Sequence, residues 1–469
     1  MARGLLFIAT AIVLFIMGDE ITVYIANMSE DVWPFISSIS DKKMFEFEIE
    51  DNAHLGDRDI FAVAPNGGIL CVLPRTVSEA YLAYYSQIMN VTNARVVVPP
   101  KHTGEICEDI LRSEKTLDAL IEASGEHKSL TLLSYTTSLQ FLQLVKVLRE
   151  RGIKVNTPEA PEEEDAWIVN FFGSKSGIRQ FVQKSGAVEP DLRMPEGLFC
   201  VGIDDAARIA ANKYVARDGV VIKTNKGHSG SGVLIFRPGE LPKQYSVCRE
   251  KIRETLSKDV YWDRFPIVIE DYIAANPGVG GGFPNVEFKV QKSGKVEFLY
   301  YCGMRVTKEG SFRGVEIHHS VVSDKIEAQM VDTGFFVGEQ YAKAGYHGYY
   351  DVDFVAGRGG ELFVTESNVR RTGGTHVYAV ANRLFGKEFM YETYTLSCNT
   401  YPLPKGKKFT FTSLLEILKP VLFDKKTREG VILVSENMLE MGQMQYIIFG
   451  ANKKRALEIE AEMERLLVG

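Results

Sequence analysis

Short apolar runs alternate with amphipathic stretches along residues 21–195 of the chain. This alternation is typical of α/β domains, in which helices cover buried strands. The stretch TSLQFLQLVKVLRERG at 137–152 has helical spacing and ends on Gly152, a common helix stop. The runs that predict strands are ITVYIANMSED (21–31), IFAVAP (60–65), ILCVLP (69–74), ARVVVPP (94–100), LTLLSY (130–135) and WIVNFFG (167–173). We therefore predict a parallel-sheet domain, with the acidic PEAPEEED at 158–165 as a solvated loop.

The composition is that of an ordinary globular protein, and it narrows the choice of partners. At 469 residues the chain exceeds what one hydrophobic core usually supports, so further domains are expected. The net charge is −7 and no long Lys/Arg run occurs, which excludes an electrostatic nucleic-acid partner. The six cysteines lie far apart without C-x-x-C pairs, which disfavours a zinc site and a disulfide framework. We expect a reducing, cytoplasmic compartment.

The N-terminus begins with an apolar stretch, from Leu5 to Met17. Its 13 residues are too few to cross a bilayer, and Arg3 alone supplies a positive flank. A cleavage site of small residues does not follow the stretch. We interpret residues 1–20 as an apolar extension and expect no membrane association, with secretion or membrane anchoring as the alternative.

A cation and a glycine-rich turn stand together in VVIKTNKGHSGSGVLIF at 220–236. The pattern predicts a hairpin, with Lys223 inside the first apolar strand. Such a turn can direct backbone N–H groups at an anion. It differs from a Walker loop, which leads into a helix, and a surface hairpin remains the alternative. The residues of the turn are Gly227, His228, Ser229, Gly230, Ser231 and Gly232.

Two further strands carry acidic residues. PIVIEDYIAA at 266–275 ends in Glu270, Asp271 and, two residues on, Ile273, where an acid and strand-end backbone groups could hold adenine and ribose. NVEFKV at 285–290 places Glu287 in an alternating strand. A plain surface strand would give either pattern, so both interpretations stay open.

A second hairpin gathers oxygen ligands. The pattern GYYDVDFVAGRGGELFVTESN predicts one strand with Asp351 and Asp353 and a second with Glu366 and Asn368. Because Glu366 and Asn368 are two residues apart, they point to one face, and strand pairing can bring Asp353 beside them. Such ligands suit Mg²⁺, while the lack of imidazole and thiolate disfavours zinc. Arg370 follows, where its guanidinium could offset charge on a phosphoryl group; a solvated edge strand is the alternative.

The order of these features along residues 196–400 resembles that of ATP-grasp enzymes. The resemblance implies two α+β subdomains that hold ATP between them. Lys213, Lys223 and the glycine-rich turn would contact the nucleotide, Glu270, Asp271 and Ile273 would frame adenine, and Glu287 would hold ribose. Asp353, Glu366 and Asn368 would bind Mg²⁺ or Mn²⁺, and Arg370 would face an acyl phosphate. Two departures are Val369, where a proline is usual, and the insert NPGVGGGFP, which stretches the spacing before Glu287.

A narrower resemblance is carried by NFFGSKSGIRQ, MPEGLFC and ESNVRRTGGTHVY. These segments are similar to the peptide ligases of pheganomycin type, which have a pre-ATP-grasp domain. The fold implied is α/β and α+β. The implied domains are a pre-ATP-grasp domain at 21–195, a small ATP-grasp subdomain at 196–265, a large subdomain with the metal site at 266–400 and a small C-terminal α+β domain at 401–469.

The resemblance implies an ADP-forming ligase, a possible homodimer, that joins a small-molecule or peptide carboxylate to an amine. ATP would activate the carboxylate as an acyl phosphate, and the amine would displace phosphate to form an amide. Arg305 or Arg313 could bind a substrate carboxylate, and His318 or His319 could accept a proton, although both histidines also fit ordinary strand positions. The alternatives are a phosphotransferase, which would yield a phosphorylated product, a nucleotide-binding regulatory module without turnover, and a surface-anchored binding protein.

Overall fold

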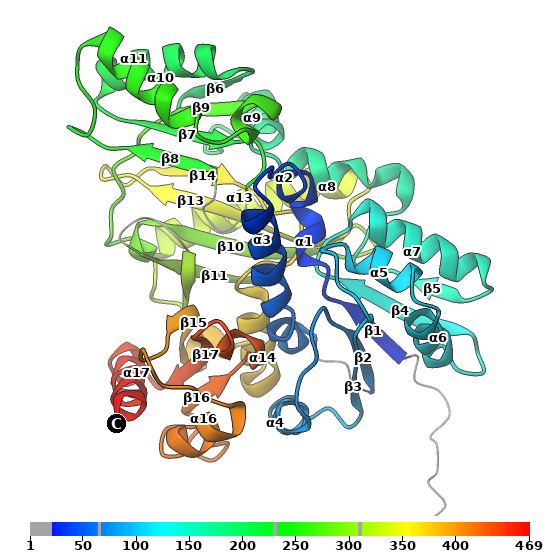
Figure 1. Cartoon of the computed structure of the whole chain (residues 1–469). Helices are drawn as coiled ribbons and strands as arrows, with labels where there is room; N and C mark the ends of the chain where they lie inside the picture. Colours follow the sequence, from blue (N-terminus) through cyan, green and yellow to red (C-terminus); the bar gives the residue numbers. More distant parts are fainter. Residues whose placement is uncertain (1–20, 64–66, 228–231, 308–311) are drawn as a thin grey trace, which may run out of the picture.

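The computed structural model describes residues 21–63, 67–227, 232–307 and 312–469. They form three β-sheets with helices packed on them (Figure 1). In Figure 1 the four-stranded sheet lies at the top, the five-stranded sheet on the right, and the C-terminal strands at the bottom. The predicted class, α/β followed by α+β, is confirmed.

The N-terminal sheet is parallel, with strand order β3-β2-β1-β4-β5. Its strands are β1 (Ile21–Ile25), β2 (Ile69–Val72), β3 (Ala94–Val97), β4 (Ser129–Ser134) and β5 (Lys154–Asn156). The helices of this part are α1 (Met28–Asp31), α2 (Trp33–Ile36), α3 (Lys42–His54), α4 (Glu79–Met89), α5 (Ile106–Leu111), α6 (Glu114–Ala123) and α7 (Leu139–Glu150), with the 3₁₀ helix η1 (Arg58–Ala62). The predicted strands at 69–74, 94–100 and 130–135 and the helix at 137–152 are thereby confirmed. The run at 21–31, predicted as one strand, is a strand only over β1 and continues into helix α1.

Three local predictions for this part are wrong. The run at 60–65 begins with η1 and the run at 167–173 forms α8 (Trp167–Phe172), because a short apolar run does not distinguish a strand from a buried helix. The aromatic rings of Trp167 and Phe171 pack one helical turn apart, with centroids separated by 5.8 Å. The acidic segment 158–165, expected to be a solvated loop, is exposed at Glu163 and Glu164 in the short helix η2 (Glu163–Asp165), but it places Glu159 in buried ion pairs.

The second sheet is antiparallel, with order β6-β9-β7-β8. Its strands are β6 (Gly197–Cys200), β7 (Val220–Thr224), β8 (Val233–Phe236) and β9 (Ile267–Asp271). The helices of this region are α9 (Lys175–Ser185), α10 (Ile203–Arg217), α11 (Tyr245–Leu256) and α12 (Tyr261–Arg264). Apolar residues of α10 and α11 cover one face of the sheet. Strand β9 belongs to this sheet, although the predicted boundary at 265/266 assigns it to the next subdomain.

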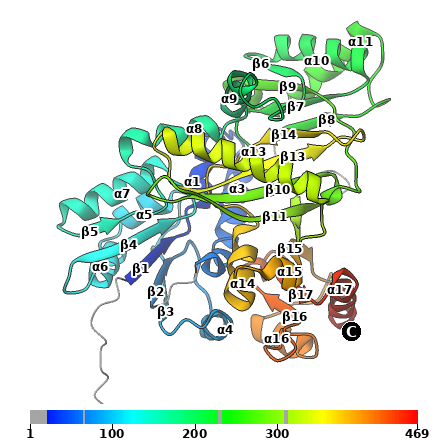
Figure 2. The ribbon, with the colours of Figure 1, turned by 180° about the vertical axis from the view of Figure 1, so that it is seen from behind.

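The third sheet has the order β14-β13-β10-β11-β12-β15-β17-β16. Its strands are β10 (Pro284–Val290), β11 (Val296–Val306), β12 (Phe312–Ile317), β13 (Gly348–Ala356), β14 (Leu362–Glu366), β15 (Tyr394–Pro402), β16 (Gly430–Leu433) and β17 (Gln443–Gly450). The remaining elements are α13 (Asp324–Lys343), α14 (Thr375–Phe385), α15 (Phe389–Glu392), α16 (Phe411–Leu418), α17 (Lys453–Val468), η3 (Gly280–Gly282) and η4 (Asn437–Leu439). Figure 2 shows α13 lying across one face of β10, β11 and β13. The predicted boundary at 400/401 falls inside β15, and β16 and β17 continue the same sheet.

Within the described residues, no helix combines the length and the apolar character needed to cross a membrane. The predicted apolar extension at 1–20 lies outside the part of the chain that the structure describes.

Candidate active site

The hairpin β13–β14 brings the predicted metal ligands together. Asp353 pairs in register with Glu366 on β14 and with Asn285 on β10. Asn285 Nδ2 donates to Asp353 Oδ1 at 2.6 Å and to Asp351 Oδ2 at 3.0 Å. Because paired residues of adjacent strands point to the same side, the carboxylates of this group share one sheet face.

Asn368 joins this group from the segment after β14. Its Nδ2 donates to Asp353 Oδ2 at 3.2 Å and to Asp351 Oδ1 at 3.1 Å. Its amide oxygen accepts a hydrogen bond from Arg370 Nη2 at 3.1 Å. The structure thus places Asp353, Glu366 and Asn368 side by side, with Arg370 on the amide oxygen.

The electrostatics of the group fit a hard divalent cation. Burial and the nearby charge of Glu366 raise the pKa of Asp353, and burial and Asp353 raise that of Asp351. Two carboxylates and an amide oxygen are ligands that Mg²⁺ accepts. Within the described residues, no three histidine, cysteine, aspartate or glutamate side chains are gathered as a metal site.

Lys175 is a site residue that the sequence analysis missed. Its Nζ lies 2.7 Å from Glu366 Oε2, and its charge lowers the pKa of Glu366. Lys175 is the first residue of α9, and its backbone N–H donates to Asn225 O at the end of β7. The lysine belongs to the quoted motif NFFGSKSGIRQ, but its distance from Glu366 along the sequence concealed the contact.

Lys223 and Glu270 pair across the small sheet. Lys223 Nζ lies 2.7 Å from Glu270 Oε2, and Arg179 Nη2 lies 2.5 Å from Glu270 Oε1. Burial raises the pKa of Glu270, but the charges of Lys223 and Arg179 outweigh it and hold the pKa below its usual value. Lys223 Nζ also donates to Thr365 O on β14 at 3.4 Å, which links the small sheet to the metal-ligand hairpin.

The structure separates the two predicted nucleotide lysines. Lys213, on α10, pairs with Asp271 at 2.7 Å, whereas Lys223 pairs with Glu270. Successive residues of a strand point to opposite faces, so Asp271 turns toward α10 and Glu270 toward β14. Lys213 therefore lies on the helix-covered face of the small sheet. Ile273 follows β9 and is half-buried.

The predicted hairpin β7–β8 forms, and Gly227 and Gly232 flank its turn. Thr224 N donates to Gly232 O at 2.7 Å, and Gly232 has φ +80°. A Cβ at Gly232 would lie 2.2 Å from Thr224 Cγ2, so glycine is required there. The predicted phosphate-binding residues His228, Ser229, Gly230 and Ser231 lie outside the described residues.

Arg370 connects the metal-ligand hairpin to the N-terminal domain. Its Nε lies 2.7 Å from Asp31 Oδ2 and its Nη1 donates to Tyr135 Oη at 3.0 Å. Asp31 also lies 3.5 Å from Lys226 Nζ, next to the glycine-rich turn. Asp31 and Tyr135 follow β1 and β4, the strands beside which the strand order reverses, and such crevices commonly bind ligands. Sequence analysis assigned neither residue to the site.

Glu287 is enclosed by the protein. It is 0% exposed and accepts hydrogen bonds from Tyr300 Oη at 2.6 Å, Thr372 Oγ1 at 2.7 Å and Thr375 Oγ1 at 2.5 Å. Burial raises its pKa. Glu287 pairs in register with Asp351, so it neighbours the metal-ligand group, and the ribose contact stays a prediction.

Arg305, Arg313, His318 and His319 belong to a different neighbourhood. Arg305 Nη2 lies 2.8 Å from Glu460 Oε1 on α17, and its Nη1 donates to Ser397 O at 3.0 Å. Burial and the adjacent His319 lower the pKa of His318 to about 4, which makes it a weak base at neutral pH. The substrate and proton-transfer roles of these side chains stay predictions.

Comparison with known proteins gives a family match and a curated relative. The family model of the pre ATP-grasp domain matches residues 61–149. The L-propargylglycine–L-glutamate ligase of Streptantibioticus cattleyicolor is 23% identical over 294 residues, which cover 59% of this chain and 55% of that ligase. The match thus spans about half the length of that curated relative.

Solved structures share the fold over most of the chain. An N5-carboxyaminoimidazole ribonucleotide synthetase in complex with ADP has a TM-score of 0.53 at 10% identity, with 95% of this chain and 96% of that chain covered. The Thermus thermophilus synthetase gives 0.51 at 13%, covering 96% and 99%. The biotin carboxylase domain of Hydrogenobacter thermophilus 2-oxoglutarate carboxylase, a dimer solved with MgADP, gives 0.51 at 13%, covering 94% and 89%.

The resemblance to ATP-grasp enzymes that the sequence indicates is therefore confirmed. The chain contains a pre ATP-grasp domain and has an ATP-grasp fold.

Proposed function

We propose that this protein is an ATP- and Mg²⁺-dependent ligase that activates a carboxylate as an acyl phosphate and couples it to an amine. The observation that carries the proposal is the group of Asp353, Glu366 and Asn368 beside Lys175 and Arg370. Solved structures with the same fold were obtained with ADP or MgADP. A relative named for L-propargylglycine and L-glutamate supports two substrates of amino-acid type.

In this proposal Asp353, Glu366 and Asn368 hold Mg²⁺, which offsets negative charge on the polyphosphate. Lys175 and Lys223 lie on the side of the small sheet that faces β14, where they can contact the phosphates. Asn368 Oδ1 and Arg370 are bonded to each other in the present arrangement, so nucleotide binding would exchange this bond for contacts to ligand. For Lys213 to contact the nucleotide as predicted, its ammonium group would have to bind Asp271 and the nucleotide at the same time.

The reaction would proceed in two displacements. A substrate carboxylate oxygen attacks the γ-phosphorus of ATP, the bond to the bridging oxygen breaks, and ADP leaves. During this transfer Arg370 could turn from Asp31 toward the charge that develops on the phosphoryl group. The amine nitrogen attacks the acyl carbon, phosphate departs with the bonding electrons, and the amine loses a proton to form the amide.

Two further proposals concern the state of the protein. The six cysteines are free, which is consistent with a reducing, cytoplasmic environment. One solved relative is described as a dimer, and we propose that this chain can form a homodimer as well. Light scattering of the purified protein would measure its mass directly.

The proposal is tested by incubating the protein with MgATP and pooled amino acids and short peptides. We expect ADP release together with a product whose mass is the sum of two panel members minus water. A phosphorylated panel member with ADP would instead indicate a phosphotransferase. ATP binding with neither ADP nor product over the whole panel would contradict the proposed coupling of amino-acid-type substrates.

A further inference from the structure

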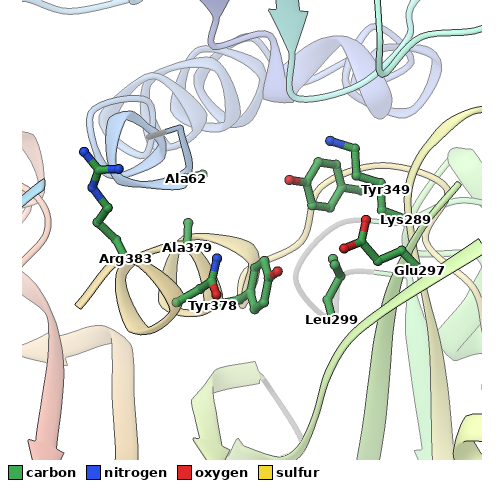
Figure 3. A pocket seen from close by; sticks show the side chains of 9 residues that line it. Ala62, Lys289, Glu297, Leu299, Tyr349, Tyr378, Ala379 and Arg383 are labelled. Carbon is green, nitrogen blue, oxygen red and sulfur yellow. The ribbon is translucent and has the colours of Figure 1, made fainter. Parts of the chain in front are cut away.

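The N-terminal domain contacts the two later sheets in different ways. Beside the large sheet it leaves a cavity of about 400 Å³, with Ala62 on one wall and α14 and the strands β10, β11 and β13 on the others (Figure 3). Arg371 Nη1 donates to Ala62 O at 3.1 Å and its Nη2 lies 2.6 Å from Glu159, so buried polar contacts hold this side. Beside the small sheet, the contact is made by Phe35 of α2.

Tyr261, the first residue of α12, packs against two hydrophobic clusters. Its ring lies beside that of Trp262, with centroids 5.0 Å apart, and Trp262 is buried in the core of the small sheet. The ring of Tyr261 also meets that of Phe35 in a T-shaped arrangement, with centroids 5.1 Å apart. Phe35 forms a cluster of the N-terminal domain with Val32 and Ile36. Tyr261 thus joins the core of the small sheet to α2.

Arg264, the last residue of α12, adds a hydrogen bond to the same contact. Its Nη1 donates to the carbonyl oxygen of Ser38, shortly after α2, at 3.0 Å. Because Arg264 is exposed, water competes for its guanidinium, and we expect this bond to contribute less than the packing of the rings. One apolar and one polar contact therefore attach α12 to the N-terminal domain.

The contact with α2 supports the end of the small sheet that carries Lys223. Strand β9 begins at Ile267, shortly after α12 ends, and Ile267 pairs in register with Thr224, the neighbour of Lys223 on β7. Toward the other end of the same strand, Glu270 is held by Arg179 of α9. The small sheet is thus attached near both ends of β9, by packed rings at one end and by an ion pair at the other.

We propose that Tyr261 is a positioning residue, which acts on Lys223 through the orientation of the small sheet. By packing on Phe35 it holds this sheet at one angle to the large sheet. At this angle Lys223 Nζ reaches Thr365 O on β14, at 3.4 Å. An attachment at Glu270 alone would let the sheet tilt about that point, and a tilt would move Lys223 away from β14. The effect on nucleotide binding rests on the proposed function, whereas the angle of the sheet does not.

The angle is tested in the full-length protein without nucleotide. Spin labels would be attached at two exposed positions, Asp118→Cys on α6 and Glu254→Cys on α11, in a Cys200→Ser background that removes a half-buried thiol. Pulsed electron paramagnetic resonance measures the distribution of distances between the labels. We expect a broader distribution in Tyr261→Ala than in wild type, and no change in Tyr261→Phe, which keeps the ring. Equal distributions in wild type and Tyr261→Ala would overturn the proposal.

A matched control and a variant on the other side of the contact accompany this test. Tyr245→Ala removes an exposed tyrosine at the start of α11 and should leave the distance distribution unchanged. Phe35→Leu removes the second ring of the contact without altering the small sheet, and should broaden the distribution as Tyr261→Ala does. A broad distribution in Tyr261→Ala beside a wild-type one in Phe35→Leu would indicate a local defect of the small sheet and would also overturn the proposal.

The release of nucleotide gives a second measurement. MgADP with a fluorescent N-methylanthraniloyl group would be displaced by excess unlabelled ADP in a stopped-flow instrument. We expect release from Tyr261→Ala to be at least fivefold faster than from wild type, and release from Tyr261→Phe and Tyr245→Ala to match wild type. Release from Tyr261→Ala at the wild-type rate would contradict the positioning role. If no variant binds nucleotide, the proposed function fails, and the distance distributions alone decide the role of Tyr261.

Discussion

At the scale of single residues, the site carries charges that compensate each other in the absence of ligand. Lys175 neutralises Glu366, and Asp31 neutralises Arg370, each across 2.7 Å. Both pairs join residues that the proposed reaction requires for other contacts. In the proposed reaction, a bound cation would replace Lys175 at Glu366, and a polyphosphate would replace Asp31 at Arg370.

Glu366→Gln is expected to lower the rate of ADP formation at least a hundredfold while the fold is retained. The amide keeps the shape of the side chain but removes a negative charge from the proposed metal group. The rate would be measured with saturating ATP across a range of Mg²⁺ concentrations, and the fold by circular dichroism.

The matched control is Glu361→Gln, which alters an exposed carboxylate just before β14 on the same hairpin. It should leave the rate within about twofold of wild type, because surface charges of this kind contribute little. A Glu366→Gln variant as active as this control would place the metal site elsewhere.

At the scale of elements, α9 and β9 are joined by buried charge. Arg179 on α9 reaches Glu270 on β9 and also donates to Pro195 O at 3.1 Å and Gly197 O at 3.3 Å. These contacts fix the small sheet on the helix whose first residue is Lys175. The position of Lys175, which we propose contacts the phosphates, therefore depends on the ion pair between Arg179 and Glu270.

Arg179→Met is expected to lower the free energy of unfolding by about 3–5 kcal/mol, because it leaves part of the buried Glu270 charge uncompensated. Urea unfolding followed by fluorescence would measure the loss. Arg193→Met removes an arginine from an exposed pair with Asp191 and should cost less than about 1 kcal/mol. Equal losses in both variants would show that the buried pair has no special role.

Those parts of the fold and of the candidate site that depend on a local pattern of apolar, polar and glycine residues could be predicted from the sequence. The β13–β14 hairpin, with Glu366 and Asn368 on one face, follows from alternation and a glycine turn. The contacts of Lys175 with Glu366 and of Asp31 with Arg370 could not be predicted, because they join segments far apart in sequence. The helix α8 was predicted as a strand because its apolar run is too short to show a helical period.

At the scale of the whole molecule, the N-terminal domain contacts the segment after β14 and the C-terminal residues near η4. Arg370 and Arg371 bind Asp31 and Glu159, and Asp57 accepts backbone hydrogen bonds from Glu436 and Asn437 at 2.6 and 2.7 Å. Burial raises the pKa of Asp57 to about 6. The candidate active site thus lies between parts that are widely separated along the chain.

Arg305 links β11 to α17 through its ion pair with Glu460. Variants of this pair can show whether Arg305 has a structural role or binds substrate. We expect Glu460→Gln and Arg305→Met each to lower the free energy of unfolding by about 2–4 kcal/mol, because each leaves a largely buried partner uncompensated. Urea unfolding and the KM for the carboxylate substrate would be measured for both variants. A raised KM in Arg305→Met alone would support the predicted substrate contact, and an unchanged KM in both would contradict it.

The large sheet continues through β15 to β17, so the position at which the chain is truncated decides whether β15 keeps its partner strand. A fragment ending at residue 400 would lack β17, whose strand pairs with β15 through Leu396 and Ile448. It would leave an unpaired, apolar strand edge, which is a template for intermolecular pairing. Such a fragment should accumulate in inclusion bodies. We therefore expect the residues after 400 to be required for the stability of the large sheet, because they supply the strand that covers the edge of β15.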